Sequence, residues 1–251
     1  MTATAGDPIG RAASAQATTW AVLWGVSLSH GINDIMQSLV TAIYPVLQAE
    51  FALDYWQIGL LSFAFMVTAS ALQPVVGAVT DRRSLPMILP AGMAFTLVAV
   101  FHPEGSRVSR AASGGRYGTA QSLFQMGGNL GHMAGPLLAA FVVAPWGRGS
   151  VAWFALGAAA GIAVLWRVAR WHDSHRAAQA ARPAPERPHH GLRRSRVVWA
   201  LVVLAVLVFT KNIYTATLAS YWTFYVIERF GLTAQQSQLM LFAFMAGSTA
   251  G

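Results

Sequence analysis

The sequence of 251 residues has no cysteine, one lysine and few charged residues of any kind. Without cysteine, no disulfide and no thiolate metal site can form. Charged residues make up 10% of the chain, against about 25% in soluble domains, while 55% of the residues are hydrophobic. This composition excludes an ordinary soluble domain and indicates an all-α, polytopic membrane helix bundle.

The formal charge of +8 comes almost entirely from arginine, because Lys211 is the only lysine. A basic excess indicates nucleic-acid binding when it gathers on a soluble face with interleaved aromatic residues. Here the arginines lie between apolar runs, where they orient membrane helices. We therefore expect the lipid bilayer, and no nucleic acid, as a partner. Residues 1–19 lack the apolar centre and cleavage site of a signal peptide, and we expect an attached cytoplasmic tail.

The stretch from Trp20 to Leu47 has 28 residues, which as one helix would reach ~42 Å and cross a ~30 Å hydrocarbon core with tilt. Its polar residues share one helical face: Ser27, His30, Asn33 at the edge, Asp34, Gln37 and Thr41. An ionisable side chain within a membrane normally faces a bundle interior or a water-filled cavity. We interpret Asp34 as a proton-carrying carboxylate beside His30. The alternative is that the two side chains pair only to hold helices together.

A second crossing is predicted from Gln57 to Val79, and it ends in the segment Gly77-x-x-x-Asp81-Arg82-Arg83. Gly77 would permit close helix approach, and Asp81 would pair with an arginine or cap the next helix. The alternative is an ordinary basic turn on the cytoplasmic side.

The apolar run from Met87 to Phe101 has 15 residues, or ~23 Å of helix, which is too short for a crossing. An even number of crossings must separate the arginines on its two sides, because all of them mark the cytoplasmic face: Arg82, Arg83, Arg107, Arg110 and Arg116. Either the run is re-entrant or about one helix of sequence is missing here. We favour a missing helix.

Two stripes run along the crossing predicted from Thr119 to Trp146: a polar stripe of Gln121, Gln125, Asn129 and His132, and a glycine stripe of Gly127, Gly131 and Gly135, with Pro136 next to it. Small residues at this spacing let two helices pack closely. The glycines alone would fit a merely tightly packed helix. With the polar stripe beside them, we interpret this helix as part of a transport pathway.

After a crossing from Val151 to Trp166, residues 167–196 contain eight arginines and four histidines. We read this segment as a flexible basic linker, attracted to anionic lipid head groups. The pair His189-His190 lies in it and is expected to be solvated rather than to bind metal.

Another crossing is predicted from Val197 to Ile227, with Lys211 near its middle and Tyr214 on the same face. A buried ammonium should find a carboxylate, a backbone carbonyl or an anionic substrate, or else reach an interface. A last apolar run starts at Leu239 and meets no flanking charge before Gly251, so we expect a truncated chain. The expected domains are a cytoplasmic tail (1–19), an N-terminal bundle (20–168), a basic cytoplasmic linker (169–196) and the start of a second bundle (197–251).

Four stretches together resemble the fosmidomycin-resistance branch of the major facilitator superfamily: SLSHGINDIMQSLVTAIYPVLQAEF, LQPVVGAVTDRR, FHPEGSRVSRAASGGRYGTAQSLFQMGGN and SYWTFYVIERFGL. The likeness covers nearly everything from Val22 onward. It implies a twelve-helix transporter of the bacterial inner membrane, with two six-helix bundles, alternating access and drug export driven by proton entry. The glycine stripe resembles the helix-five signature of drug:proton antiporters, with Ala139 and Ala140 where that pattern has glycine.

The resemblance also assigns residues. Asp34 and Glu104 fall on family segments that carry carboxylates in or near the membrane, and Arg107 and Lys211 are the matched cations. The residues Gly77, Asp81 and Arg82 match the loop motif between the second and third helices of the superfamily. Against the family pattern, material is missing between Val100 and Phe101, so that the third and fourth helices are fused into one short run, and the chain ends near the eighth helix.

We predict proton-coupled efflux of a small polar or anionic compound such as fosmidomycin, without enzyme activity, cofactor or metal site. Asp34, His30 and Glu104 would carry the proton. The substrate pathway would be lined by Asn33, Gln37, Arg107, Gln125, Asn129, His132, Lys211 and Tyr214. The alternatives are uptake of a related metabolite by proton symport, an inactive remnant or assembly partner, and a membrane-embedded enzyme, for which the sequence has no Ser-His-Asp arrangement or HExxH motif.

Overall fold

The computed structural model describes residues 18–82, 87–94, 101–180 and 191–250, and every regular element in these ranges is a helix. The elements are α1 (Trp20–Ala42), α2 (Tyr44–Phe51), α3 (Tyr55–Arg82), α4 (Ile88–Ala94), α5 (Phe101–Ala112), α6 (Tyr117–Leu138), α7 (Ala144–Trp146), α8 (Phe154–Ala180), α9 (Arg194–Phe230) and α10 (Ala234–Ala250), with a π-helical turn at Ala139–Val143 and a 3₁₀ helix at Arg148–Trp153. The predicted all-α bundle is therefore confirmed for the described part of the chain.

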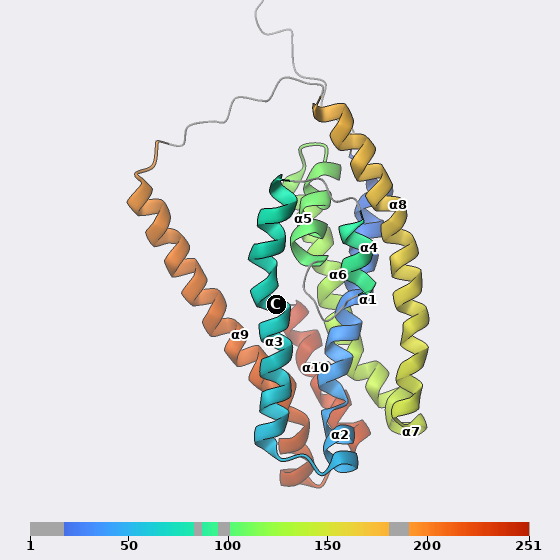
Figure 1. Cartoon of the computed structure of the whole chain (residues 1–251). Helices are drawn as coiled ribbons and strands as arrows, with labels where there is room; N and C mark the ends of the chain where they lie inside the picture. Colours follow the sequence, from blue (N-terminus) through green and yellow to red (C-terminus); the bar gives the residue numbers. More distant parts are fainter. Residues whose placement is uncertain (1–17, 83–86, 95–100, 181–190, 251) are drawn as a thin grey trace, which may run out of the picture.

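The long helices run along one axis, and α1 lies between α6, α8 and α5 (Figure 1). The start of α1, the end of α3, the connection from α5 to α6 and the end of α8 all lie at the upper end of the bundle in Figure 1. The turns α2–α3 and α9–α10 lie at the lower end, together with α7. The arginine-marked ends of α3 and α5 thus share one end, in agreement with an even number of passages between them.

Three helical segments of the described residues are long and apolar enough to cross a membrane: Tyr117–Trp146, Arg148–Arg176 and Arg194–Phe230. They contain the crossings predicted from Thr119, Val151 and Val197. Helix α1 has 23 residues, which is long enough, but its polar stripe lowers its mean hydropathy below that of these three.

The predicted continuous helix from Trp20 to Leu47 is wrong, because α1 ends at Ala42 and α2 begins at Tyr44. The break follows from Pro45, which has no N–H to donate and whose ring crowds the carbonyl four residues earlier. At this break, the side-chain amide of Gln238 on α10 donates a hydrogen bond at 2.6 Å to the carbonyl of Ala42, the last residue of α1.

The crossing predicted from Thr119 to Trp146 is helical throughout but changes its hydrogen bonding near its end. In the π-helical turn, the N–H of Ala144 donates to the carbonyl of Ala139, five residues back. Pro145 comes next and has no N–H for a regular helical bond. The wider turn therefore lets the chain reach Trp146 without ending the helix.

The segment from Phe101 to Ala112 forms the helix α5, which was not among the predicted helices. Neither α4, with 7 residues, nor α5, with 12, is long enough to cross a bilayer. The end of α5 returns to the start of α1, where the N–H of Thr19 donates to the carbonyl of Ala112 at 2.9 Å. The described part therefore holds two short helices on either side of residues 95–100, and the choice between a re-entrant run and a missing helix stays a prediction. Residues 95–100, where the missing material was predicted, lie outside the described residues.

Helix α8 continues to Ala180 and so takes up the first part of the predicted linker at 169–196. Alanine, arginine and glutamine dominate its last turns, and all three are strong helix formers. The first part of the segment predicted to be flexible is therefore helical. His189 and His190 lie outside the described residues, and the domain boundaries stay a prediction.

The largest apolar core lies where α1, α4, α5, α6 and α8 meet, in the upper half of the bundle. Its buried residues are Val22, Leu23, Val26, Leu89, Met93, Phe101, Val108, Ala112, Ala120, Phe124, Leu165 and Val168. This core surrounds the polar face of α1 and fixes the helices that carry the candidate site.

Candidate functional site

The backbones of α1 and α6 come into direct contact along the glycine stripe of α6. A Cβ on Gly131 would lie 2.2 Å from the carbonyl oxygen of Gly31, and one on Gly127 would lie 2.1 Å from that of Ser27. At Gly135, a Cβ would lie 2.0 Å from the hydroxyl oxygen of Ser38. Only glycine fits at these three positions, so the stripe sets the distance between the two helices.

Several polar residues of α1 bond to backbone carbonyls of α6 and hold the two helices together. The hydroxyl of Ser27 donates to the Leu123 carbonyl at 2.7 Å, and His30 Nδ1 lies 2.7 Å from the Phe124 carbonyl oxygen. Because a carbonyl only accepts hydrogen bonds, His30 Nδ1 must carry its proton. Part of the polar stripe therefore has a structural role.

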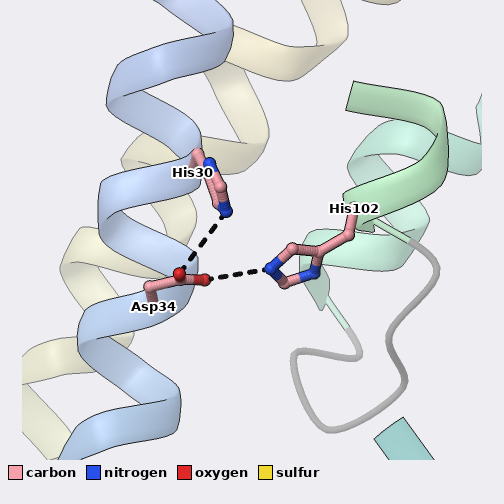
Figure 2. A group of neighbouring side chains, drawn as sticks. All are labelled: His30, Asp34 and His102. Carbon is pink, nitrogen blue, oxygen red and sulfur yellow. Dashed lines mark ion pairs between the residues drawn. The ribbon is translucent and has the colours of Figure 1, made fainter. Parts of the chain in front are cut away.

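Asp34 is different, because its carboxylate faces three imidazoles from three helices. His30 Nε2 of α1 lies 3.4 Å from Oδ2, His102 Nε2 of α5 lies 3.4 Å from Oδ1, and His132 Nδ1 of α6 lies 3.0 Å from Oδ2. Figure 2 shows His30 and His102 directed at the two oxygens of the carboxylate. Asn33 also donates its amide to Oδ1 at 3.0 Å. Because Asp34 is only 4% exposed, these contacts replace the hydrogen bonds that water would otherwise make to its carboxylate.

Aromatic rings and a glycine fix the position of the His30 imidazole. The ring stacks on Phe124, with centroids 4.0 Å apart, and lies 5.7 Å from the ring of Phe101. A Cβ on Gly128 would lie 2.6 Å from His30 Nε2 and 2.9 Å from Asp34 Oδ2. The absence of a side chain at residue 128 thus leaves room for this pair.

A second ionic cluster lies around Glu104 on α5. Glu104 is 5% exposed, and its Oε2 accepts a hydrogen bond from Arg107 at 2.9 Å. His172 of α8 places Nδ1 3.8 Å from Oε1 of the same carboxylate. Glu104, predicted to carry the proton, and Arg107, predicted to line the substrate pathway, thus pair with each other in a separate group that ties α5 to α8.

The structure does not bring the remaining predicted pathway residues to Asp34. Gln37 is half-buried on α1, while Gln125 and Asn129 are exposed on α6. Lys211 and Tyr214 are exposed on α9, whose first half leans away from the other helices in Figure 1. No ion pair of Lys211 is found among the described residues, so the partner of this ammonium stays a prediction.

The conformational motif lies at the end of α3. The backbone of Gly77, Asp81 and Arg82 is helical, so the helix runs three residues past the predicted end at Val79. The side chains of residues 69–82 lie outside the described part, and their predicted role stays a prediction.

Sequence reasoning missed His102, His172 and Gly128 as site residues. His102 stands at the start of a helix that was not recognised, although the segment has helix signals. Pro103 and Glu104 lie in its first turn and Arg110 in its last, while Phe101, Val108 and Ala112 share one buried face. Those signals predict α5, but they do not predict that its first turn lies against Asp34.

A cavity of about 690 Å³ lies at the lower end of the molecule, away from the Asp34 cluster. Its lining includes Glu50, Phe224 and Glu228, and the Tyr55 hydroxyl donates a hydrogen bond to Glu228 there. Since none of the three imidazoles lines this cavity, the Asp34 cluster and not the cavity is the candidate site.

Comparison with known proteins finds two relatives that match more than nine tenths of this chain. The chain is 44% identical over 259 residues to the "Fosmidomycin resistance protein" of Escherichia coli (strain K12), covering 93% of this chain and 64% of that protein. It is 30% identical over 256 residues to the "Uncharacterized MFS-type transporter YfnC" of Bacillus subtilis (strain 168), covering 91% of this chain and 62% of that protein. The chain thus spans less than two thirds of the length of either relative. No solved structure matches it.

Both alignments are longer than this chain of 251 residues, so in each of them this chain has gaps opposite residues of the relative. Such gaps agree with the predicted missing material, whose place between Val100 and Phe101 stays a prediction.

The family model of the Major Facilitator Superfamily matches residues 99–251, which is more than half of the chain. This model begins just before α5 and includes α6 with its glycine stripe. The apolar helices, the family match and the two relatives together identify a multi-pass membrane protein of a transporter family rather than an enzyme. The chain belongs to the major facilitator superfamily.

Proposed function

We propose that this protein moves a small polar or anionic compound across the bacterial inner membrane in exchange for protons, with Asp34 as the proton-carrying group. The observation that carries the proposal is the buried Asp34 carboxylate, 4% exposed, which contacts imidazoles of α1, α5 and α6. Ionisable groups at such depth in a membrane protein are costly and typically belong to proton or substrate pathways.

The contacts of Asp34 support a coupling between proton binding and helix movement. An ionised Asp34 attracts a cationic His102 or His132, and these residues belong to different helices from Asp34. A proton on the carboxylate removes this attraction and changes the relative stability of arrangements in which α5 and α6 lie close to α1 or apart from it. Proton occupancy then biases the conformation, which is what transport by alternating access requires.

The class of substrate is inferred from the relatives and from the exposed polar side chains. The Escherichia coli relative is named for fosmidomycin resistance. On α6, the amides of Gln125 and Asn129 are exposed near His132, and on α5 the guanidinium of Arg107 is partly exposed beside Glu104. We assign hydrogen bonding of the compound to the two amides and attraction of its negative charge to Arg107. That Lys211 and Tyr214 line the substrate pathway stays a prediction.

The test uses the chain reconstituted in liposomes with a pH gradient and radiolabelled fosmidomycin outside. With an acidic lumen, proton exit should drive accumulation of the label, and a protonophore should abolish it. The direction of the gradient separates exchange from symport in either orientation of the protein. Accumulation only with an acidic exterior would establish uptake by symport instead, and no accumulation under either gradient would contradict both.

Single cysteines test whether the cluster faces an aqueous passage, since the chain has none of its own. Asn129→Cys, on the exposed face of α6 near His132, should react with a charged, water-soluble thiol reagent in membranes. Val202→Cys should not react, because lipid covers it: Val202 is 45% exposed and lies in the first half of α9, where residues 197–209 are all apolar. Val26→Cys, in the core, is the buried control.

Equal labelling of Asn129→Cys and Val202→Cys would contradict an aqueous passage confined to the α6 side. Mass spectrometry of the intact protein measures the labelled fraction after a fixed reaction time, and full labelling in detergent-denatured samples calibrates it.

A further inference from the structure

We propose that His30, His102 and Asp34 bind a divalent transition-metal ion of the zinc class, which connects α1 to α5. Their candidate ligand atoms all lie within 4.8 Å of one another. The inference goes beyond the proposed function and does not rest on it, because it concerns equilibrium binding of a cation and needs neither a substrate nor a gradient. A sequence reading found no metal site, since these three ligands share no recognisable spacing motif.

The hydrogen bonding of His30 leaves its second ring nitrogen available as a ligand. Nδ1 donates its proton to the Phe124 carbonyl at 2.7 Å, so the neutral ring has a lone pair on Nε2. Nε2 is buried, faces Asp34 Oδ2 at 3.4 Å and makes no hydrogen bond to any group in the described part of the chain. Metal-binding histidines characteristically donate the other ring N–H to a backbone carbonyl or a carboxylate. The lone pair and the carboxylate would repel each other unless a cation lies between them.

The distances fit a metal ion better than a direct hydrogen bond. Both His30 Nε2 and His102 Nε2 lie 3.4 Å from a carboxylate oxygen of Asp34, as the dashed lines in Figure 2 mark. Tetrahedral zinc with bonds of about 2.0–2.2 Å to nitrogen and oxygen places neighbouring ligand atoms roughly 3.3–3.5 Å apart. An N–H···O hydrogen bond is centred at about 2.9–3.0 Å.

The surroundings orient the ligands as the outer partners of a metal site do. Asn33 and His132 each bond to one oxygen of Asp34 at 3.0 Å, and such second-shell contacts hold a ligating carboxylate in place. The missing side chain at Gly128 leaves space beside His30 Nε2. Two imidazoles and a carboxylate suit Zn²⁺, Co²⁺ or Ni²⁺, whereas Mg²⁺ and Ca²⁺ prefer ligands that are all oxygen.

The experiment titrates the purified 251-residue chain in detergent with Zn²⁺ in a calorimeter and then examines the loaded protein by zinc X-ray absorption. One ion per chain should bind, with nitrogen and oxygen neighbours and the outer-shell scattering of imidazole. His30→Ala and His102→Ala should each weaken binding by more than about 100-fold, since loss of a mere outer partner already costs 10–100-fold. Asn33→Ala, which removes such a partner, should weaken it by about 10–100-fold.

Matched histidine controls exclude binding elsewhere. His175→Ala, whose ring stacks on Trp171, and the double variant His189→Ala/His190→Ala should bind Zn²⁺ like the parent chain. If His30→Ala does not fold, His102→Ala decides, because its side chain is 31% exposed and outside the tightest packing. Unchanged affinity in folded His102→Ala, or loss of binding in the double variant, would overturn the proposal. The zinc titration does not depend on flux measurements in liposomes. A failure of the transport proposal would therefore not affect the metal-binding proposal.

Discussion

Replacing Asp34 with asparagine is expected to abolish proton-driven accumulation of fosmidomycin in liposomes, to the level of liposomes without protein. Asparagine keeps the size of the side chain but cannot bind and release a proton at the pH values of the experiment. It also removes the negative charge that three imidazoles face. The contacts to His30, His102 and His132 then no longer depend on a proton at residue 34. The rate of label uptake under an acidic lumen measures the effect.

The matched control is Asp54→Asn, because Asp54 is an exposed carboxylate in the turn before α3. It should leave the rate within experimental error of the parent protein. Size-exclusion profiles in detergent establish that both variants fold and enter the membrane. Full proton-driven uptake by folded Asp34→Asn would remove this carboxylate from the mechanism.

Replacing Gly131 with alanine should cause a large loss of stability for a single added methyl group. The new Cβ would lie 2.2 Å from the Gly31 carbonyl oxygen and 2.9 Å from its Cα, so only separation of the backbones of α1 and α6 relieves the clash. Overpacking of this kind costs about 1–3 kcal/mol. A stabilisation of about 1 kcal/mol from the higher helix propensity of alanine offsets part of it. Thermal unfolding in detergent, followed by circular dichroism, should show a lower Tm.

Gly118→Ala is the control within the same helix, because nothing lies within 4 Å of a Cβ there. Its Tm should be equal to or higher than that of the parent chain. Gly135→Ala should also lower the Tm, since its Cβ would lie 2.7 Å from the Ser38 Cβ, which rotation of the Ser38 hydroxyl does not move. A Tm for Gly131→Ala at or above that of Gly118→Ala would show that the two helices do not pack this closely in the membrane.

Local periodicity predicted the central helix pair well. The polar face of α1 and the glycine stripe of α6 each follow from residues three or four apart on one helix, and both meet in the structure. The breaks were harder to predict. Pro45 ended α1, yet Pro136 lies inside α6, because what a proline does to a helix depends on whether neighbouring groups compensate for the missing hydrogen bond.

Residue roles that depend on a partner were predicted less well. Lys211 was expected in the interior because of its depth in an apolar run, but α9 buries only residues of its second half. Glu104 and Arg107 were assigned separate roles, but in the structure they pair with each other, in a cluster with His172 and apart from Asp34. Burial of a charged group depends on the neighbouring helices, and the composition of its own helix does not determine it.

The amino-acid sequence by itself determined that this is a membrane helix bundle with an ionisable stripe, because the apolar content and helical spacing of each segment are local properties. Only the tertiary structure decided that His102 of α5 and His132 of α6 join His30 at Asp34. These residues are about 70 and 100 positions apart from it in the chain, as their numbers show. Packing between helices brings them within a few ångströms, and no pattern within one helix encodes which residue on another helix will face it.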